Sequence, residues 1–576
     1  MKRRFSASEV AAAIMRSDSS EDTDFANSDS DFEPESSDGD NSNVDVDSDD
    51  NSADVSAIVA APAVGGTVPN NWVDPAGTVP TLPAFTGRAG VLIETEDFTP
   101  LDFWKLYVDD DLMNHIVCQT NLYAEQVVHG PNIGPMSRKR DWSPTTKVEM
   151  YKFFGLLFLT GLVKKPQIAQ YWSTDPLYTT PLFGKIMTRN RFQLLLSMLH
   201  YNDNSQAPRT TDPNRDRLYK IRPVLDHLFE RFQAVYGLSR DIAIDESLLL
   251  WKGRLLFKQY LPLKRSRFGI KLYKLCESYT GYTYRFRVYP GKDSTLEFPT
   301  GVPQPPADFM ATEKIVWHLV MPLLNLGHHL YVDNFYTSIP LFKYLFAAGT
   351  CACGTIRANR KGYPQQLTKK KQKLGDVSSL RSGPLLAVKF TDKKDVHMLS
   401  TIHDESVQTV PVRRRAVQTM NKPLCILEYN KAMGGVDRSD QLLEPYDATR
   451  KTMTWYKKLA IHLFQLSMLN AHIVYQKSIA DPKPFMDFTH DVIGGLLFNG
   501  DDPEDEPRSE SIARITGRHF IERIPPTNKE RPQKRCRVCW KNNVRRETRY
   551  YCPQCPSLPG LCLEDCFKKY HTSVKY

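Results

Sequence analysis

The sequence contains no apolar run long enough to cross a membrane. The longest, residues 153–163, has eleven residues and includes Gly and Thr, whereas a spanning helix needs about twenty. Cysteine is also sparse over most of the chain, because six of the eleven cysteines crowd into residues 536–566. An odd, clustered set without secretory features indicates metal ligation rather than disulfide bonds. We therefore expect no membrane partner and no disulfide framework.

Lys and Arg are missing from one stretch altogether. Residues 17–54 hold fifteen Asp or Glu and neither basic residue, and because the whole chain carries +9, everything outside this stretch carries +24. Such a surplus favours polyanionic partners, since Lys and Arg on phosphates release counterions. The acidic stretch and the Pro-, Gly- and Ala-rich tract after it have little to bury. We expect residues 1–94 to be a disordered, acidic and low-complexity region.

The length of 576 residues predicts several modules rather than one core. Helical patterns fill residues 95–240 and return over 447–510, and we interpret them as two parts of one discontinuous all-α domain. Residues 241–358 predict strands at 241–250, 270–276 and 282–289, a helix at 311–324, a strand at 328–332, a helix at 340–348 and a strand at 353–356. This order is that of a ribonuclease-H-like α/β domain.

Acidic residues stand at meaningful points of that domain. Asp245 lies on its first strand and Asp333 at the end of its fourth, and these strands are parallel neighbours in the topology, so we expect the two carboxylates side by side. Asp437 follows Gly434 and opens a helix-like segment, with Asp440 three residues later. Carboxylates gathered in this way can hold two Mg²⁺ or Mn²⁺ ions about 3.5–4 Å apart, which clamp both oxygens of a phosphodiester exchange.

Two of these acids also have simpler interpretations. Asp437 can be an N-cap that accepts backbone N–H groups, and Asp440 can merely complement the helix dipole. In addition, Asp437 lies 104 positions after Asp333, a distance far longer than the connections that α/β units usually have. We therefore predict an inserted subdomain at 359–423, with a strand pair at 386–390 and 396–401, before the catalytic core resumes at 424–446.

Basic residues cluster next to the acids in sequence and predict a DNA groove, although an ordinary charged surface is the alternative. Trp455 could stack on an unpaired base or be a packed helix aromatic, and both interpretations stay open. The candidate DNA contacts are Lys252, Arg254, Lys258, Lys264, Arg265, Arg267, Lys271, Arg450, Lys451, Trp455, Lys457, Lys458, Arg545, Arg546 and Arg549.

After a linker at 511–533, residues 534–576 form a Cys-rich segment. Its candidate zinc ligands are Cys536, Cys539, Cys552, Cys555, Cys562, Cys566 and His571. Two C-x2-C pairs at this spacing are a strong zinc signal. Seven ligands are one short of two tetrahedral sites, so one or two Zn²⁺ are expected. The eighth ligand could be His519, a water or nothing.

Several local strings are familiar. The chain resembles the transposases of the piggyBac superfamily from about residue 95 to its end. The strings that carry the resemblance are Ile244-Asp245-Glu246, Trp251-Lys252-Gly253-Arg254, Arg267-Phe268-Gly269-Ile270-Lys271, Asp333-Asn334-Phe335-Tyr336-Thr337-Ser338, Cys353-Gly354-Thr355-Ile356-Arg357 and Gly434-Gly435-Val436-Asp437-Arg438-Ser439-Asp440-Gln441.

The resemblance implies a DDE/D cut-and-paste transposase with Asp245, Asp333 and Asp437 as catalytic acids and Asp440 as a further acid near them. It implies a homodimer that acts on double-stranded DNA and takes no small-molecule substrate. The DNA substrate and basic runs such as Arg531-Pro532-Gln533-Lys534-Arg535 indicate the nucleus. The helical domain would serve dimerisation and DNA binding, and the C-terminal segment would be a cross-braced two-zinc module. Each transposon end would be excised through a hairpin and joined to TTAA targets. The alternatives are a domesticated DNA-binding or chromatin protein without cleavage, and a zinc-module scaffold that binds proteins.

Overall fold

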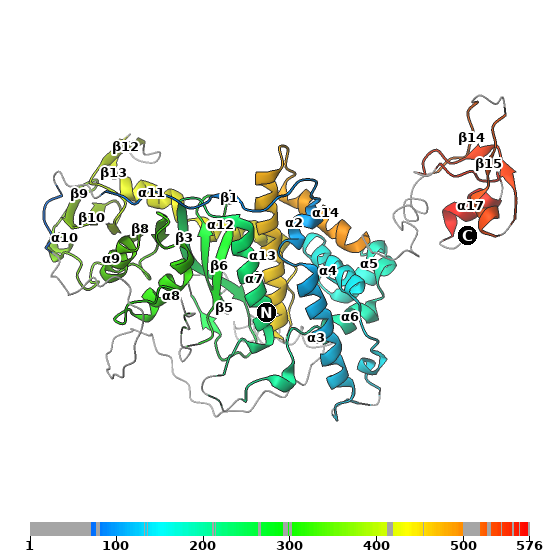
Figure 1. Ribbon diagram of the computed structural model, residues 1–576, viewed down its shortest axis with the longest axis horizontal. Coiled ribbons are helices and arrows are strands. Elements are labelled where there is room, and N and C mark those ends of the chain that lie inside the picture. Colours follow the sequence, from blue (N-terminus) through cyan, green and yellow to red (C-terminus); the bar gives the residue numbers. More distant parts are fainter. Residues whose placement is uncertain are drawn as a thin grey trace, which may run out of the picture. The chain divides into compact units, whose positions relative to one another are not determined.

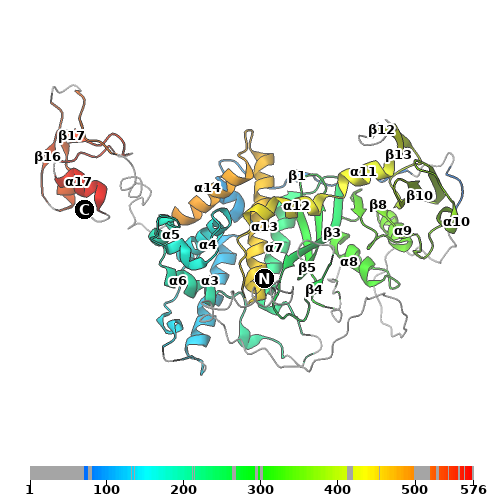
Figure 2. The same cartoon turned by 180° about the vertical axis from the view of Figure 1, so that it is seen from behind.

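The computed structural model shows two compact units, one within residues 1–147 and 157–491 and the other within 148–156 and 492–576. Figures 1 and 2 show the chain from two opposite sides. The structure describes residues 71–75, 81–131, 133–134, 136–209, 212, 215–262, 267–291, 296, 298, 302–411, 419–452, 454–498, 519–526, 531–542, 544–555, 558–563 and 565–573. The acidic stretch at 17–54 and the basic candidates Lys264 and Arg265 lie outside these residues.

The first unit is built around a nine-stranded sheet of order β4-β5-β3-β7-β8-β11-β10-β9, with β6 also paired to β5. Its strands are β3 (Asp241–Leu250), β4 (Gln259–Tyr260), β5 (Phe268–Glu277), β6 (Thr283–Val288), β7 (His329–Val332), β8 (Cys351–Thr355), β9 (Val377–Ser382), β10 (Leu385–Thr391) and β11 (Asp395–Ser400). The pairs β3–β7 and β7–β8 are parallel, and the other pairs in the sheet are antiparallel. The predicted element order from residue 241 to residue 356 is therefore present.

The strand pair predicted at 386–390 and 396–401 is present as β10 and β11, but it does not stand apart from the core. Strand β11 pairs with the edge of β8, so that β9, β10 and β11 continue the same sheet. The reason is that β8 has a free edge on the side away from β7, and an unpaired edge is satisfied by adding a strand. Outside this sheet, β12 (Val407–Pro411) and β13 (Thr419–Pro423) form a separate hairpin.

Helices cover the sheet (Figure 1): α7 and α8 contact β6, α12 contacts β3 and β5, and α9 and α11 contact β8. The helices of eight or more residues are α3 (Asp110–Val128), α4 (Lys147–Leu162), α6 (Arg189–Met198), α7 (Arg222–Val235), α8 (Ala311–Val320), α9 (Ile339–Ala347), α11 (Leu424–Ala432), α12 (Gly435–Leu443), α13 (Trp455–Ser478), α14 (Phe485–Phe498) and α17 (Asp565–Thr572). Shorter ones are α2 (Pro100–Lys105), α5 (Pro181–Ile186), α10 (Gln365–Lys369) and α16 (Arg537–Lys541).

Helix α13 connects the two helical segments that the sequence assigns to one domain. It packs against α2, and the indole of Trp104 donates a hydrogen bond to the carbonyl of Phe464. The hydroxyl of Tyr456 lies 2.9 Å from Nδ1 of His200. On its other side, the amide of Asn470 exchanges two hydrogen bonds with the backbone of Thr283 on β6. The helix is therefore fixed both to the helical segment and to the sheet.

The prediction of disorder up to residue 94 is wrong for its last part. Val73 pairs with Arg381 of β9, and the indole of Trp72 donates to the carbonyl of Gly362. Further on, Phe85 meets His328 edge to face, and β1 (Gly90–Val91) pairs with β2 (Tyr236–Gly237). These residues have no core of their own, but the sheet supplies backbone partners and aromatic contacts that composition does not reveal.

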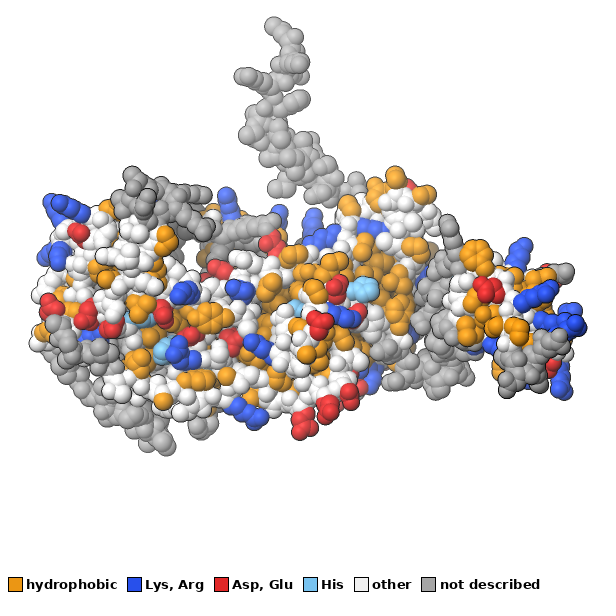
Figure 3. Space-filling view, turned by 90° about the horizontal axis from the view of Figure 1, so that it is seen from above, with side chains coloured by type: hydrophobic (Ala, Val, Ile, Leu, Met, Phe, Trp, Pro, Cys, Tyr) orange, Lys and Arg blue, Asp and Glu red, His pale blue; other side chains and the backbone are white. Residues whose placement is uncertain are grey.

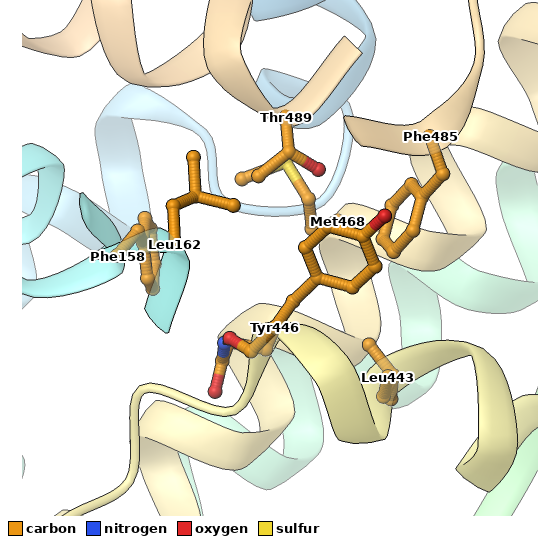
Figure 4. A pocket seen from close by; sticks show the side chains of 8 residues that line it. Phe158, Leu162, Leu443, Tyr446, Met468, Phe485 and Thr489 are labelled. Atoms are coloured by element: carbon orange, nitrogen blue, oxygen red, sulfur yellow. The ribbon is translucent and has the colours of Figure 1, made fainter. Parts of the chain in front are cut away.

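A small apolar pocket lies among α4, α12, α13 and α14 (Figure 4), where Leu162, Leu443, Met468 and Phe485 line it. Its lining includes none of the predicted catalytic acids. Among the described residues, no helix is long and apolar enough to cross a membrane.

Candidate active site

The parallel pairing of β3 with β7 brings the first two predicted acids together. The register ends at Ile244 opposite Val332, so the next residue on each strand is Asp245 and Asp333. Neighbouring strands lie about 4.8 Å apart, which places the two carboxylates side by side at the same sheet position. Each carboxylate is oriented by a nearby backbone N–H: Asp245 accepts from Glu246 at 2.8 Å and Asp333 from Phe335 at 3.0 Å.

A third carboxylate, that of Glu246, joins them, although the sequence did not predict it as a site residue. Oxygen atoms of Asp245, Glu246 and Asp333 all lie within 4.8 Å of one another. Glu246 is held by Lys271 of β5, whose ammonium lies 2.9 Å from Oε1, and both side chains are nearly inaccessible. The ammonium also lies 4.8 Å from the centre of the Phe335 ring. Lys271, predicted to contact DNA, is therefore a buried partner of the acid group.

The electrostatics of the group follow from burial and from this pairing. Burial, and then the charge of Glu246, raise the pKa of Asp333 above its ordinary value. Burial alone would also raise the pKa of Glu246, but the charge of Lys271 and its hydrogen bonds bring it below the ordinary value. In the absence of a cation, ionised Asp333 is therefore the less stable of these two carboxylates.

The last two acids lie on α12, which begins at Gly435, two residues before the predicted start at Asp437, so that Asp437 lies in the first turn and Gly434 is the N-cap. A Cβ atom on Gly435 would stand 2.8 Å from the carbonyl oxygen of Glu277, so only glycine lets this helix lie so close to the end of β5. Asp437 is exposed in the first turn and is not part of the 4.8 Å group of Asp245, Glu246 and Asp333. The structure therefore brings together two of the three predicted catalytic acids.

Asp440 lies one turn further and has a different set of partners. Its Oδ1 accepts hydrogen bonds from Lys274 at 2.7 Å and from the hydroxyl of Ser247 at 2.9 Å. Burial would raise the pKa of Asp440, but the charge of Lys274 and these two hydrogen bonds hold it below the ordinary value. Lys274, which the sequence did not single out, is completely buried.

The acid group is suited to a hard divalent cation. Carboxylate oxygens are the ligands that Mg²⁺ prefers, and two ligands of one Mg²⁺ lie at most about 4.2 Å apart. The spacing of up to 4.8 Å among Asp245, Glu246 and Asp333 therefore requires only small side-chain movements. The pKa of Asp333 is raised first by burial and then by the charge of Glu246, and a bound cation would offset both effects.

The predicted DNA contacts separate into exposed and buried residues. Lys457 and Lys458 are buried, and the ammonium of Lys457 donates to the carbonyls of Leu196 and Ser197 at the end of α6. For these two, and for Lys271, burial contradicts the prediction of a DNA surface. The physical reason is that an ammonium group can satisfy buried carbonyls or carboxylates as well as phosphates. Sequence spacing alone does not distinguish these environments.

Two more candidates are partly buried and engaged within the chain. The guanidinium of Arg450 donates to the carbonyls of Lys165 and Pro166 and lies over the Tyr171 ring. Trp455 packs edge to face on Phe257, in agreement with its interpretation as a packed aromatic. The candidates with exposed side chains are Lys252, Arg254, Arg267, Lys451, Arg545, Arg546 and Arg549, and Lys258 is half-buried over the Phe268 ring.

The C-terminal segment contains two four-residue clusters. One joins Cys536, Cys539, Cys562 and Cys566, and the other joins His519, Cys552, Cys555 and His571. The sequence left His519 as one option for the eighth ligand, and the structure groups it with Cys552, Cys555 and His571. The ligands of the two clusters alternate along the chain, which is a cross-brace, and β15 (Lys534–Arg535) pairs with β16 (Glu547–Thr548) in the same segment.

The spacing within these clusters fits tetrahedral zinc. Sγ of Cys539 lies 3.5 Å from Sγ of Cys566, and Sγ of Cys555 lies 3.5 Å from Nε2 of His571. Ligands about 2.0–2.3 Å from one Zn²⁺ lie about 3.3–3.8 Å apart in a tetrahedron. Lys and Arg side chains gather on the face of this module that Figure 3 shows.

Comparisons with known proteins agree with this architecture. A family model described as transposase IS4 matches residues 99–472, and one described as a DDE_Tnp_1-like zinc finger matches residues 514–572. The human PiggyBac transposable element-derived protein 3 is 27% identical over 492 residues, which are 82% of this chain and 76% of that protein. The chain belongs to the piggyBac superfamily of DDE transposases. The human PiggyBac transposable element-derived protein 2 is 25% identical over 391 residues, 66% of this chain and 62% of that protein.

A solved structure also resembles this member of the piggyBac superfamily. It is a cryo-EM structure of a piggyBac transposase synaptic complex with hairpin DNA, with a TM-score of 0.60 and 24% identity. The match covers 81% of this chain and 100% of that chain. At this identity the similarity concerns the fold, a mixed α/β architecture with a Cys-rich module at the C-terminal end.

Proposed function

We propose that this chain is a cut-and-paste DNA transposase that binds transposon terminal repeats, excises the element through hairpin ends and inserts it at TTAA targets. The observation that carries the proposal is the convergence of Asp245 and Asp333 at the ends of two parallel strands, inside a chain of the piggyBac superfamily. The proposal includes a homodimer, because two ends of one element are handled together. It also includes a location in the nucleus, because the substrate is DNA.

In this proposal Asp245, Asp333 and Asp437 hold two divalent cations, Mg²⁺ or Mn²⁺. The cations, when bound, supply an activated water and stabilise charge on both the attacking and the leaving oxygen. The chain itself orients the acids: backbone N–H groups fix Asp245 and Asp333, and Lys271 fixes Glu246 beside them. Lys252, Arg254 and Arg267 are exposed and follow Asp245 closely in the sequence. In this proposal they contact DNA phosphates near the acids.

The proposed role of the C-terminal module is to recognise DNA ends. It carries exposed Arg545, Arg546 and Arg549, and its two clusters would hold Zn²⁺ as a structural ion. Basic side chains on a small rigid module suit a DNA backbone, although a protein partner is the competing possibility. Removal of residues 534–576 is expected to lower the affinity of the chain for transposon ends. Cleavage of plasmid DNA that is already bound should be retained.

The test uses the full chain with a linear duplex that carries the DNA flanking its coding region, bounded by TTAA, in Mg²⁺ or Mn²⁺. Hairpin-ended product on a denaturing gel is expected. Asp245→Ala, Asp333→Ala and Asp437→Ala should each abolish it while leaving DNA binding largely intact. Cleavage that persists in any of the three variants would contradict the site.

A second candidate is a DNA-binding protein without cleavage. It is favoured by the names of the human relatives, which describe proteins derived from transposable elements. The same experiment separates the two: specific binding of the flanking DNA with no cation-dependent strand cleavage would support this second function.

A further inference from the structure

A lysine with no access to solvent lies on β5, next to the strand that carries Asp245 and Glu246. Lys274 is in the middle of β5 and is 0% exposed. Its ammonium lies 2.7 Å from Oδ1 of Asp440 and 3.4 Å from the hydroxyl of Ser439. Taking an ammonium group out of water is strongly unfavourable unless a partner of opposite charge compensates. The position of Lys274 therefore depends on Asp440.

The register of the sheet connects this lysine to the first catalytic acid. In the antiparallel pairing of β3 with β5, Lys274 stands directly opposite Asp245. Residues in such a pair present their side chains on the same face of the sheet. Ser247, two residues after Asp245, is on that face too, and its hydroxyl donates to the same Oδ1 of Asp440 at 2.9 Å. Asp440 is thus bound to both strands at once.

Asp440 in turn controls the helix that carries Asp437. Side chains three residues apart are neighbours on a helix, so restraining Asp440 sets the rotation of α12 about its axis and the height of Asp437 above the sheet. The first turn of α12 is held by the close backbone contact of Gly435 with Glu277. The polar contacts of Asp440 hold the second turn.

The same contacts make Asp440 a poor cation ligand. Its Oδ1 already accepts two hydrogen bonds, and the ammonium 2.7 Å away balances the charge that would attract a divalent cation. His462 of α13 also faces the pair, and burial, followed by the charge of Lys274, lowers its pKa, so that it is neutral near pH 7. The carboxylate of Asp440 therefore supplies the compensating charge.

We propose that Lys274, which is buried, and Asp440, whose side chain is 35% exposed, form a lock that positions α12, and with it Asp437, against the catalytic strands. Asp440 is then a positioning residue rather than a metal ligand. The assignment of Asp437 as a cation ligand rests on the proposed function, whereas the lock itself is a property of the fold.

The experiment uses the full chain and three variants: Lys274→Met, Asp440→Asn and the double variant that carries both. Hydrogen exchange of the α12 amides is measured first, and Mn²⁺ binding is then measured by calorimetry in the absence of DNA. Asp440→Asn leaves the buried ammonium of Lys274 without its charged partner, and Lys274→Met leaves Asp440 with only the hydrogen bond from Ser247. In each single variant α12 exchange should therefore accelerate about tenfold or more and Mn²⁺ affinity should fall. The double variant removes both charges and should return exchange to within about threefold of the native chain, with Mn²⁺ binding regained.

A matched control is available in the same sheet. Lys389 of β10 is also buried and pairs with Asp395 at 2.9 Å, but it contacts neither α12 nor the acid group. Lys389→Met should leave α12 exchange and Mn²⁺ affinity unchanged. A double variant that folds with native α12 exchange yet binds no Mn²⁺ would make Asp440 a ligand and overturn the proposal. Unchanged α12 exchange in Lys274→Met would show that no lock exists.

These readouts also separate the lock from the enzyme activity. If the native chain binds Mn²⁺ but cleaves no DNA, the proposed transposase function fails while the exchange and calorimetric results still decide the lock. If cleavage is observed, the lock predicts that the double variant cleaves better than either single variant, which a direct metal-binding role of Asp440 does not allow.

Discussion

Replacing Gly435 by alanine tests whether the close packing of α12 on the sheet is needed for catalysis. The added Cβ would lie 2.8 Å from the carbonyl oxygen of Glu277 and 3.2 Å from Cα of Ser278, where both neighbours belong to the backbone. Since an ordinary contact begins at 3.4 Å, the helix has to move away by about 0.6 Å, and overpacking of this kind costs about 1–3 kcal/mol. The better helix propensity of alanine offsets less than about 1 kcal/mol of that cost, because Gly435 is the first residue of the helix.

The expected consequence is larger for activity than for stability. A misplacement approaching 1 Å can cost about 100-fold in rate, and Asp437 lies only two residues beyond the substituted position. We expect Gly435→Ala to lower cation-dependent cleavage of the flanked duplex by about 10- to 100-fold, with a change of less than about 2 kcal/mol in the free energy of unfolding by urea.

Gly434 provides the control. A Cβ atom there would meet nothing within 4 Å, and its φ of −73° suits any residue. Gly434→Ala changes only the N-cap of α12, which costs less than about 1 kcal/mol, and should cleave nearly as well as the native chain. Equal cleavage by the two alanine variants would refute the argument that backbone contact sets the position of Asp437.

Three further outcomes are expected. Because burial and then Glu246 raise the pKa of Asp333, the charged carboxylate costs folding free energy that is absent below its unfolded pKa and is fully present above its folded pKa. Asp333→Asn should therefore be more stable than the cation-free native chain at pH 7, on the order of 1 kcal/mol, with the difference vanishing near pH 3; equal urea midpoints at pH 7 would contradict this. His519→Ala should reduce zinc from about two ions to about one per chain by atomic absorption, whereas replacement of the exposed His490 should remove none. Lys457→Met should destabilise the fold by about 1–3 kcal/mol because carbonyls of α6 lose their donor, yet leave the salt dependence of DNA affinity unchanged, which a phosphate contact would not.

The strands of the core and the neighbourhood of Asp245 and Asp333 could be predicted from the sequence. Their short apolar runs have clear period and length, and the element order leaves one ribonuclease-H-like topology, which fixes which strands are parallel neighbours. A helix after the two glycines follows from local signals in the same way, although α12 begins at Gly435, two residues before the predicted start at Asp437. Such predictions succeed because they depend on local patterns and on a small number of allowed connections.

The surroundings of the lysines could not be predicted, because they depend on which face of an element becomes covered. Lys271 and Lys457 have the same sequence signature as exposed lysines, but one lies against Glu246 and the other against the end of α6. His519 is 33 residues from Cys552, and its membership of a cluster depends on chain folding that no spacing rule includes. The extension of the sheet by β11 likewise depends on a free edge of β8.

The two buried lysines of β5 explain how a crowded group of carboxylates can be held together before a cation binds. Lys271 and Lys274 lie three positions apart, so they face opposite sides of the sheet, and each compensates a different acid: Glu246 on one side and Asp440 on the other. Asp245 stands directly opposite Lys274 in the β3–β5 register, next to Glu246 on β3. Because the carboxylates outnumber the lysines, the site keeps a negative excess that favours divalent cations, while each face of β5 carries one lysine that offsets the charge of one carboxylate.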